Sequence, residues 1–86
     1  MITVRGGKQY HKDIANKATN WAISRLGLSD KPFEIVVVIQ SLEDCHGECY
    51  PARDAHRPRY FIKVTPDTSL RNFVGTILHE MVHVRQ

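Results

Sequence analysis

The segment from Leu70 to the chain end constrains the fold most strongly, because its apolar residues recur at helical spacing. One stripe holds all of them: Leu70, Phe73, Val74, Ile77, Leu78, Met81 and Val82. Such a stripe is typical of an amphipathic helix that packs one face against a core. The residues Pro66-Asp67-Thr68-Ser69 supply turn and N-cap chemistry, so we expect the helix to begin directly after them.

The same helix carries an H-E-x-x-H pattern at residues 79–83. Histidines four residues apart project from one face of a helix, so the His79 and His83 imidazoles can meet one zinc ion. Zinc lowers the pKa of a bound water towards about 7, and Glu80 can take the proton of that water. The pattern therefore predicts His79 and His83 as zinc ligands and Glu80 as the catalytic base. The alternative is two solvated histidines on a polar helix face.

The predicted metal face points away from the apolar stripe. At about 100° per residue, both histidines fall on the side of the helix that also carries Asn72 and Thr76. Gly75 lies near this face, and its lack of a side chain can let another backbone approach closely. We therefore expect a metal ion in whatever cleft the rest of the fold builds over this side.

Upstream of this helix the pattern predicts a helix, a strand, a long loop and a second strand. The residues expected on the buried face of the first helix, Lys8–Leu26, are Tyr10, Ile14, Ala18, Trp21, Ala22 and Leu26. Gly27 follows as a C-cap. The β-branched stretch Phe33–Gln40 predicts a buried strand, and Arg59–Thr65 predicts a second strand. Between them we expect a polar loop over residues 41–58, a length that is often functional.

The predicted loop contains a second group of candidate ligands: Cys45, His46, Cys49 and His56. Thiolates and imidazoles at short spacing can bind zinc, so this group predicts a structural metal site or an upstream ligand for the helix site. The alternative is a polar loop with two free thiols. Two cysteines are too few for a disulfide scaffold.

Length and composition place the chain among small globular proteins. Its 86 residues predict one domain, residues 1–86, with a core small enough that a metal or partner can add noticeable stability. The longest apolar run, Ile35–Ile39, is far shorter than the roughly 20 residues that span a bilayer. The N-terminus lacks the apolar core of a signal peptide, so we expect a soluble, cytoplasmic or otherwise intracellular protein with no membrane partner.

The formal charge of +3 is a mild bias towards anionic partners. A group near the end of the predicted loop mixes cations with an aromatic ring, which can suit single-stranded nucleic acid: Arg53, His56, Arg57, Arg59 and Tyr60. The alternative is an ordinary solvent-exposed face, because clusters of charged residues usually form such faces.

Residues 76–83, Thr-Ile-Leu-His-Glu-Met-Val-His, resemble the active-site helix of the SprT/Spartan-like zinc metallopeptidases. The order of strand, Cys-x-x-x-Cys loop, strand and motif helix is similar too, over roughly residues 8–86. The resemblance implies a small zincin-like α+β core, with Zn²⁺ held by His79 and His83 and with Glu80 as general base. It implies protein or peptide substrates, and the best-known members cleave proteins bound or crosslinked to DNA, so DNA is a further expected partner.

In that family the third zinc ligand is usually a histidine downstream of the motif, whereas this sequence ends at Gln86, three residues after His83. We expect either a longer native chain or a site completed by water, another subunit, or a loop histidine, His46 or His56. A peptide substrate is expected along an exposed strand edge, with Tyr60–Thr65 as the candidate. Two other functions fit the sequence: a toxin- or repressor-cleaving zincin, and a non-catalytic metal- or nucleic-acid-binding module.

Overall fold

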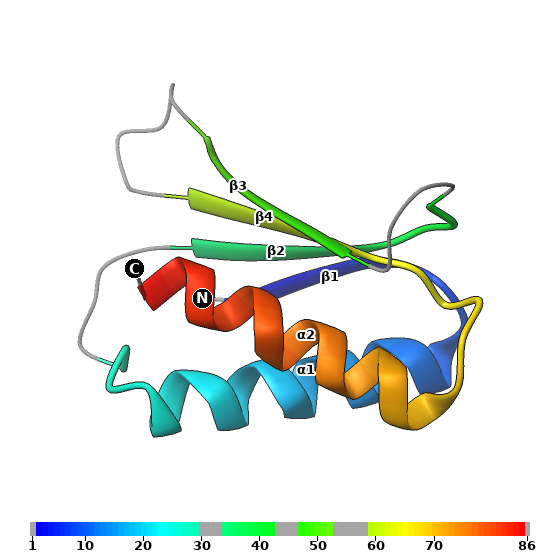
Figure 1. Ribbon diagram of the computed structural model, residues 1–86, viewed down its shortest axis with the longest axis horizontal. Coiled ribbons are helices and arrows are strands. Elements are labelled where there is room, and N and C mark those ends of the chain that lie inside the picture. The colour runs from blue at the N-terminus through cyan, green and yellow to red at the C-terminus, as the bar shows by residue number, and fades with distance from the viewer. Residues whose placement is uncertain (1, 30–33, 43–46, 53–58, 86) are drawn as a thin grey trace.

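A computed structural model describes residues 2–29, 34–42, 47–52 and 59–85 of the chain (Figure 1). Within these residues the chain forms two helices and one four-stranded mixed sheet. The α+β class predicted from the sequence is therefore confirmed. In chain order the elements are β1 (Ile2–Gly6), α1 (Gln9–Arg25), β2 (Glu34–Ile39), β3 (Gly47–Ala52), β4 (Arg59–Val64) and α2 (Leu70–Arg85).

The strands of the sheet lie in the order β1-β2-β4-β3. β2 pairs in parallel with both β1 and β4, whereas β3 pairs antiparallel with β4. The chain passes from β1 to β2 through α1, since neighbouring parallel strands need a crossover connection. β1 and β3 are therefore the edges of the described sheet. The prediction that Tyr60–Thr65 offers an exposed edge is wrong, because β4 has a partner strand on each side.

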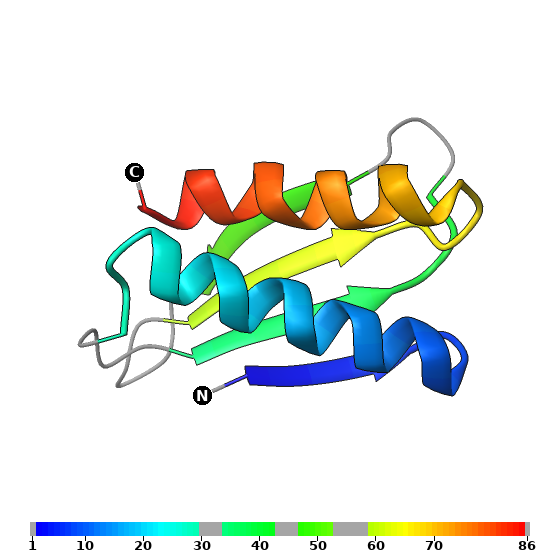
Figure 2. The same ribbon diagram turned by 90° about the horizontal axis from the view of Figure 1, so that it is seen from below.

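Both helices cover the same face of the sheet (Figures 1 and 2). Because side chains alternate along a strand, one side of β2 and β4 points towards the helices. The buried strand residues on that side are Ile35, Val37, Ile39, Ile62 and Val64. The core is the single layer between them and the apolar sides of the helices. No helix in the described ranges is long and apolar enough to cross a membrane.

α1 contacts the core mainly through small side chains. Its buried residues are Ala15, Ala18, Thr19 and Ala22. Tyr10 and Trp21, predicted on the buried face, are instead 53% and 56% exposed. The small residues let the helix backbone lie close to its neighbours in a densely packed interior, and the two large rings are left at its margin. Trp21 lies there under the Arg25 guanidinium, 5.6 Å from the ring centroid.

Two strands depart from the sequence-based prediction. β1 occupies a segment for which no strand is predicted, and its five residues offer a pattern of only two apolar positions, Ile2 and Val4. β3 lies inside the stretch 41–58, so the loop prediction is wrong for Gly47–Ala52. This strand contains Pro51, which an edge position tolerates because only one side of the strand is hydrogen-bonded. The other predicted helices and strands begin and end within two residues of those in the structure.

Candidate metal centre

α2 is fixed at its start by a cap and along its length by the core. The Ser69 hydroxyl accepts a hydrogen bond from the Asn72 backbone N–H at 3.2 Å, so the N-cap predicted at this turn is present. The buried positions of α2, in order, are Phe73, Ile77, Glu80, Met81 and Val84. Because the apolar members of this set face the core, the helix is held in one rotation about its axis. In this rotation, the side of α2 that adjoins its buried face lies under β3.

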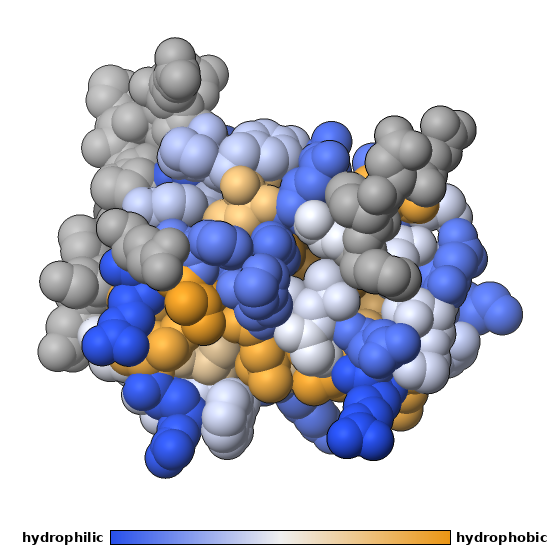
Figure 3. All heavy atoms as spheres, in the orientation of Figure 1, coloured by the Kyte–Doolittle hydropathy of each residue, from blue (hydrophilic) through white to orange (hydrophobic). Residues whose placement is uncertain are grey.

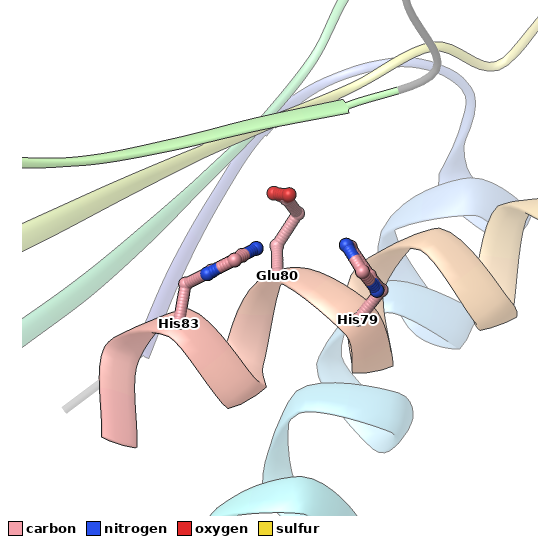
Figure 4. A group of neighbouring side chains, drawn as sticks. All are labelled: His79, Glu80 and His83. Atoms are coloured by element: carbon pink, nitrogen blue, oxygen red, sulfur yellow. The ribbon is translucent and has the colours of Figure 1, made fainter. Parts of the chain in front are cut away.

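His79, Glu80 and His83 project from this side of α2 towards β3 (Figure 4). One possible ligand atom from each residue lies within 4.8 Å of the other two. The two imidazole rings stand nearly at right angles, with centroids 5.1 Å apart. Both histidines are exposed, so their rings can turn to share one ion. The structure therefore brings together the three residues that the sequence singled out.

Glu80 differs from the two histidines because it is buried, with 6% of its surface exposed. Its Oε2 atom has no hydrogen-bond partner within the described part of the chain. Burying an unpaired polar group costs free energy, and a charged one costs more. An oxygen left in this condition next to two imidazoles points to a ligand, such as a cation or a water molecule, as its missing partner.

Gly47, the first residue of β3, lies directly against α2. A Cβ atom at Gly47 would be 2.5 Å from Thr76 Cγ2 and 3.5 Å from Glu80 Cγ. A side chain at residue 47 would therefore force the Thr76 side chain or the strand to shift. The prediction that Gly75 permits the close approach is wrong, because a Cβ there would meet nothing within 4 Å.

A cleft opens between α2 and the start of β3. Its volume is about 690 Å³. The described residues that line it are Gly47, Arg71, Asn72, Gly75, Thr76, His79 and Glu80. Figure 3 shows apolar side chains gathered over the helices and hydrophilic ones between them and the sheet. The helical periodicity correctly predicts Asn72 and Thr76 on the face of His79, but it predicts neither Arg71 nor Gly47 in the cleft.

Cys49 is the one member of the second predicted metal group that lies within the described residues; Cys45, His46 and His56 fall outside them. Its side chain is partly buried and packs against the core. Burial, together with the negative charge of Glu80, raises the pKa of the Cys49 thiol to about 11. Without a metal, the thiol is therefore neutral near pH 7. The second metal site stays a prediction.

The donor atoms of the helix site fit a divalent metal ion. Imidazole nitrogens and a carboxylate oxygen suit the intermediate metals of the first transition row, zinc among them. A cation, or a water molecule bound to that cation, would supply the partner that the Glu80 oxygen lacks. The group formed by His79, Glu80 and His83 can therefore hold a metal ion. No protein-family model, curated protein or solved structure matches this chain.

Proposed function

We propose that this chain is the core of a zinc-dependent metallopeptidase with a zincin-like architecture. His79 and His83 hold the zinc ion, and Glu80 is the general base. The observation that carries the proposal is the convergence of two exposed imidazoles beside a buried carboxylate with an unpartnered oxygen. The resemblance of residues 76–83 to the active-site helix of the SprT-like peptidases supports the same assignment. Association with DNA stays a prediction from that resemblance.

Zinc suits the two imidazoles because its protein sites are four-coordinate and accept histidine nitrogens as ligands. When bound, it supplies Lewis acidity for a carbonyl oxygen and makes a neighbouring water more acidic. Catalytic zinc sites usually have three protein ligands. His46 and His56, which lie outside the described residues, are the candidates for the third within this sequence.

Glu80 moves the proton. Its Oε2 accepts a proton from a water molecule while the oxygen of that water forms a bond to the substrate carbonyl carbon. The same carboxyl group then donates the proton to the amide nitrogen as the C–N bond breaks. One water is consumed for each peptide bond, and its elements end on the new carboxylate and the new amine. Burial of Glu80 keeps bulk solvent from competing for the carboxylate.

β3 supplies an edge along which an extended peptide can lie. It pairs with β4 on one side, and α2 packs beside it (Figure 2). A peptide that adds to this edge gains backbone hydrogen bonds whatever its side chains are. It would pass close to His79, Glu80 and His83, because these side chains point from α2 towards β3. β3 therefore replaces Tyr60–Thr65 as the proposed substrate edge.

Two measurements on one preparation test this function. Zinc-loaded protein is incubated with a mixture of unstructured peptides, and new termini are identified by mass spectrometry. The Glu80→Gln variant should keep its zinc and its thermal transition but lose cleavage, because the amide cannot accept the proton. Asp13→Asn is the matched control, since Asp13 is an exposed carboxylate on α1. Full cleavage by Glu80→Gln would contradict the assigned base, and zinc binding with no cleavage by the unaltered protein would favour a non-catalytic metal-binding module.

A further inference from the structure

The cleft carries an arginine at the end opposite His79. Arg71 and His79 both line it and are eight residues apart on α2. At a rise of about 1.5 Å per residue, their backbones are separated by roughly 12 Å along the helix axis. The cleft therefore extends from the candidate metal centre to a fixed positive charge about two turns away.

Arg71 has no evident structural task. Its guanidinium forms no ion pair or hydrogen bond with the described residues. It lies in the first turn of α2, which holds no acidic residue, and the helix dipole disfavours a cation there. The side chain is exposed, so it contributes no core packing. The Arg71 guanidinium can therefore pair with an anionic group that enters the cleft.

The rest of the cleft favours a polar occupant. Between Arg71 and His79 the lining consists of Asn72, Gly75 and Thr76, which offer no large apolar surface. Gly75 leaves open space, because nothing lies within 4 Å of where its Cβ would be. At the other end, the buried Glu80 lines the same cleft with an oxygen that has no partner within the described residues. The cleft thus has a cation, Arg71, at one end and a buried carboxyl oxygen of Glu80, without a partner in the described residues, at the other.

We propose that Arg71 binds a carboxylate of the substrate, about three to four residues from the bond that is cleaved. This proposal rests on the proposed peptidase function, because that function places the reacting bond beside Glu80. An extended peptide advances about 3.3 Å per residue, so roughly 12 Å corresponds to that number of residues. The guanidinium fork matches a carboxylate in shape and charge. The carboxylate comes either from an Asp or Glu side chain or from the C-terminus of the substrate.

Binding is measured separately from cleavage, so that the two proposals can fail independently. Zinc-loaded Glu80→Gln protein is titrated with fluorescein-labelled peptides of identical sequence that carry Asp or Asn at one position in turn. A second pair ends in a free carboxylate or an amide. The acidic member of one pair should bind about fivefold more tightly, the scale of one partly exposed ion pair. The first pair identifies a side-chain carboxylate and the second a C-terminal one.

Arg71 variants then assign the preference to this residue. Arg71→Gln in the same background should abolish the acidic preference, and Arg71→Glu should replace it with a preference for Lys at the same position. Arg85→Gln is the control, because it removes an exposed cation from the last turn of the same helix. The Arg71 variants should unfold at or above the temperature of the parent, since they relieve an unfavourable charge.

Equal binding of every acidic and neutral pair, or an equal effect of Arg85→Gln, would overturn the Arg71 proposal. If the unaltered protein cleaves peptides without an acidic preference, the peptidase function stands and this inference fails. If the acidic preference is present in binding but no peptide is cleaved, the carboxylate site stands and the peptidase function fails.

Discussion

Gly47→Ala tests whether β3 is held against α2 as closely as the candidate site requires. The new Cβ would lie 2.5 Å from Thr76 Cγ2 and 3.2 Å from the Lys63 backbone oxygen, whereas ordinary contacts begin at 3.4 Å. The Thr76 methyl therefore has to move by about 1 Å, and a β-branched side chain in a helix has few other rotamers. Overpacking of this kind costs about 1–3 kcal/mol, and the stiffer unfolded chain returns about 0.4–1 kcal/mol. We expect a net loss of about 1–2 kcal/mol in the free energy of unfolding.

Urea and thermal denaturation followed by circular dichroism measure this loss, at about 4–8 °C per kcal/mol for a domain of this size. Gly75→Ala is the matched control, because the same chemical change inside α2 meets no atom within 4 Å and should stabilise the protein by about 0.5–1 kcal/mol. Thr76→Ala removes the methyl group in the way, so the double variant with Gly47→Ala should recover most of the loss. A Gly47→Ala variant as stable as the parent, or strict additivity in the double variant, would refute the close approach.

Two further predictions concern Cys49 and Phe73. The raised pKa of Cys49, about 11 against an ordinary 9.0, means that the folded protein holds the thiol proton more tightly than the unfolded chain. The stability that this contributes is fully present below pH 9 and is lost as the pH rises towards 11, which denaturation at a series of pH values would show. In folded, metal-free protein at pH 8, iodoacetamide should alkylate Cys49 more slowly than in protein unfolded by urea. Glu80→Gln should speed the reaction of the folded protein, because it removes the negative charge that helps to raise the Cys49 pKa. Equal rates in folded and unfolded protein would contradict this. Phe73→Ala should lower the free energy of unfolding by about 3–5 kcal/mol, because Phe73 is 1% exposed in the core between α1 and α2. A loss under about 1 kcal/mol, measured by urea denaturation, would contradict this packing.

α2 could be predicted from the sequence because the required signals are local. Its apolar stripe, its cap at Ser69 and the spacing of His79 and His83 all follow from the geometry of one helix. The positions of Asn72 and Thr76 beside His79 follow from the same geometry. These features need no knowledge of the rest of the fold.

The missing parts of the prediction depend on contacts between distant segments. Residues 47–52, Gly-Glu-Cys-Tyr-Pro-Ala, read as a loop, and their pairing with β4 makes them a strand. The burial of Glu80 depends on this strand, because Gly47 lies against α2 only once β3 is in place. The cleft that includes Arg71 forms for the same reason. A sequence pattern on one helix cannot report what packs over it.

Zinc content after equilibrium dialysis tests most directly whether His79 and His83 bind one zinc ion together. The unaltered protein should retain about one zinc per chain, the stoichiometry of one four-coordinate site. His79→Ala and His83→Ala should each lose it, whereas His11→Ala, which changes a histidine on α1 outside the group, should retain it. A full equivalent of zinc in the double variant of His79 and His83 would contradict the account.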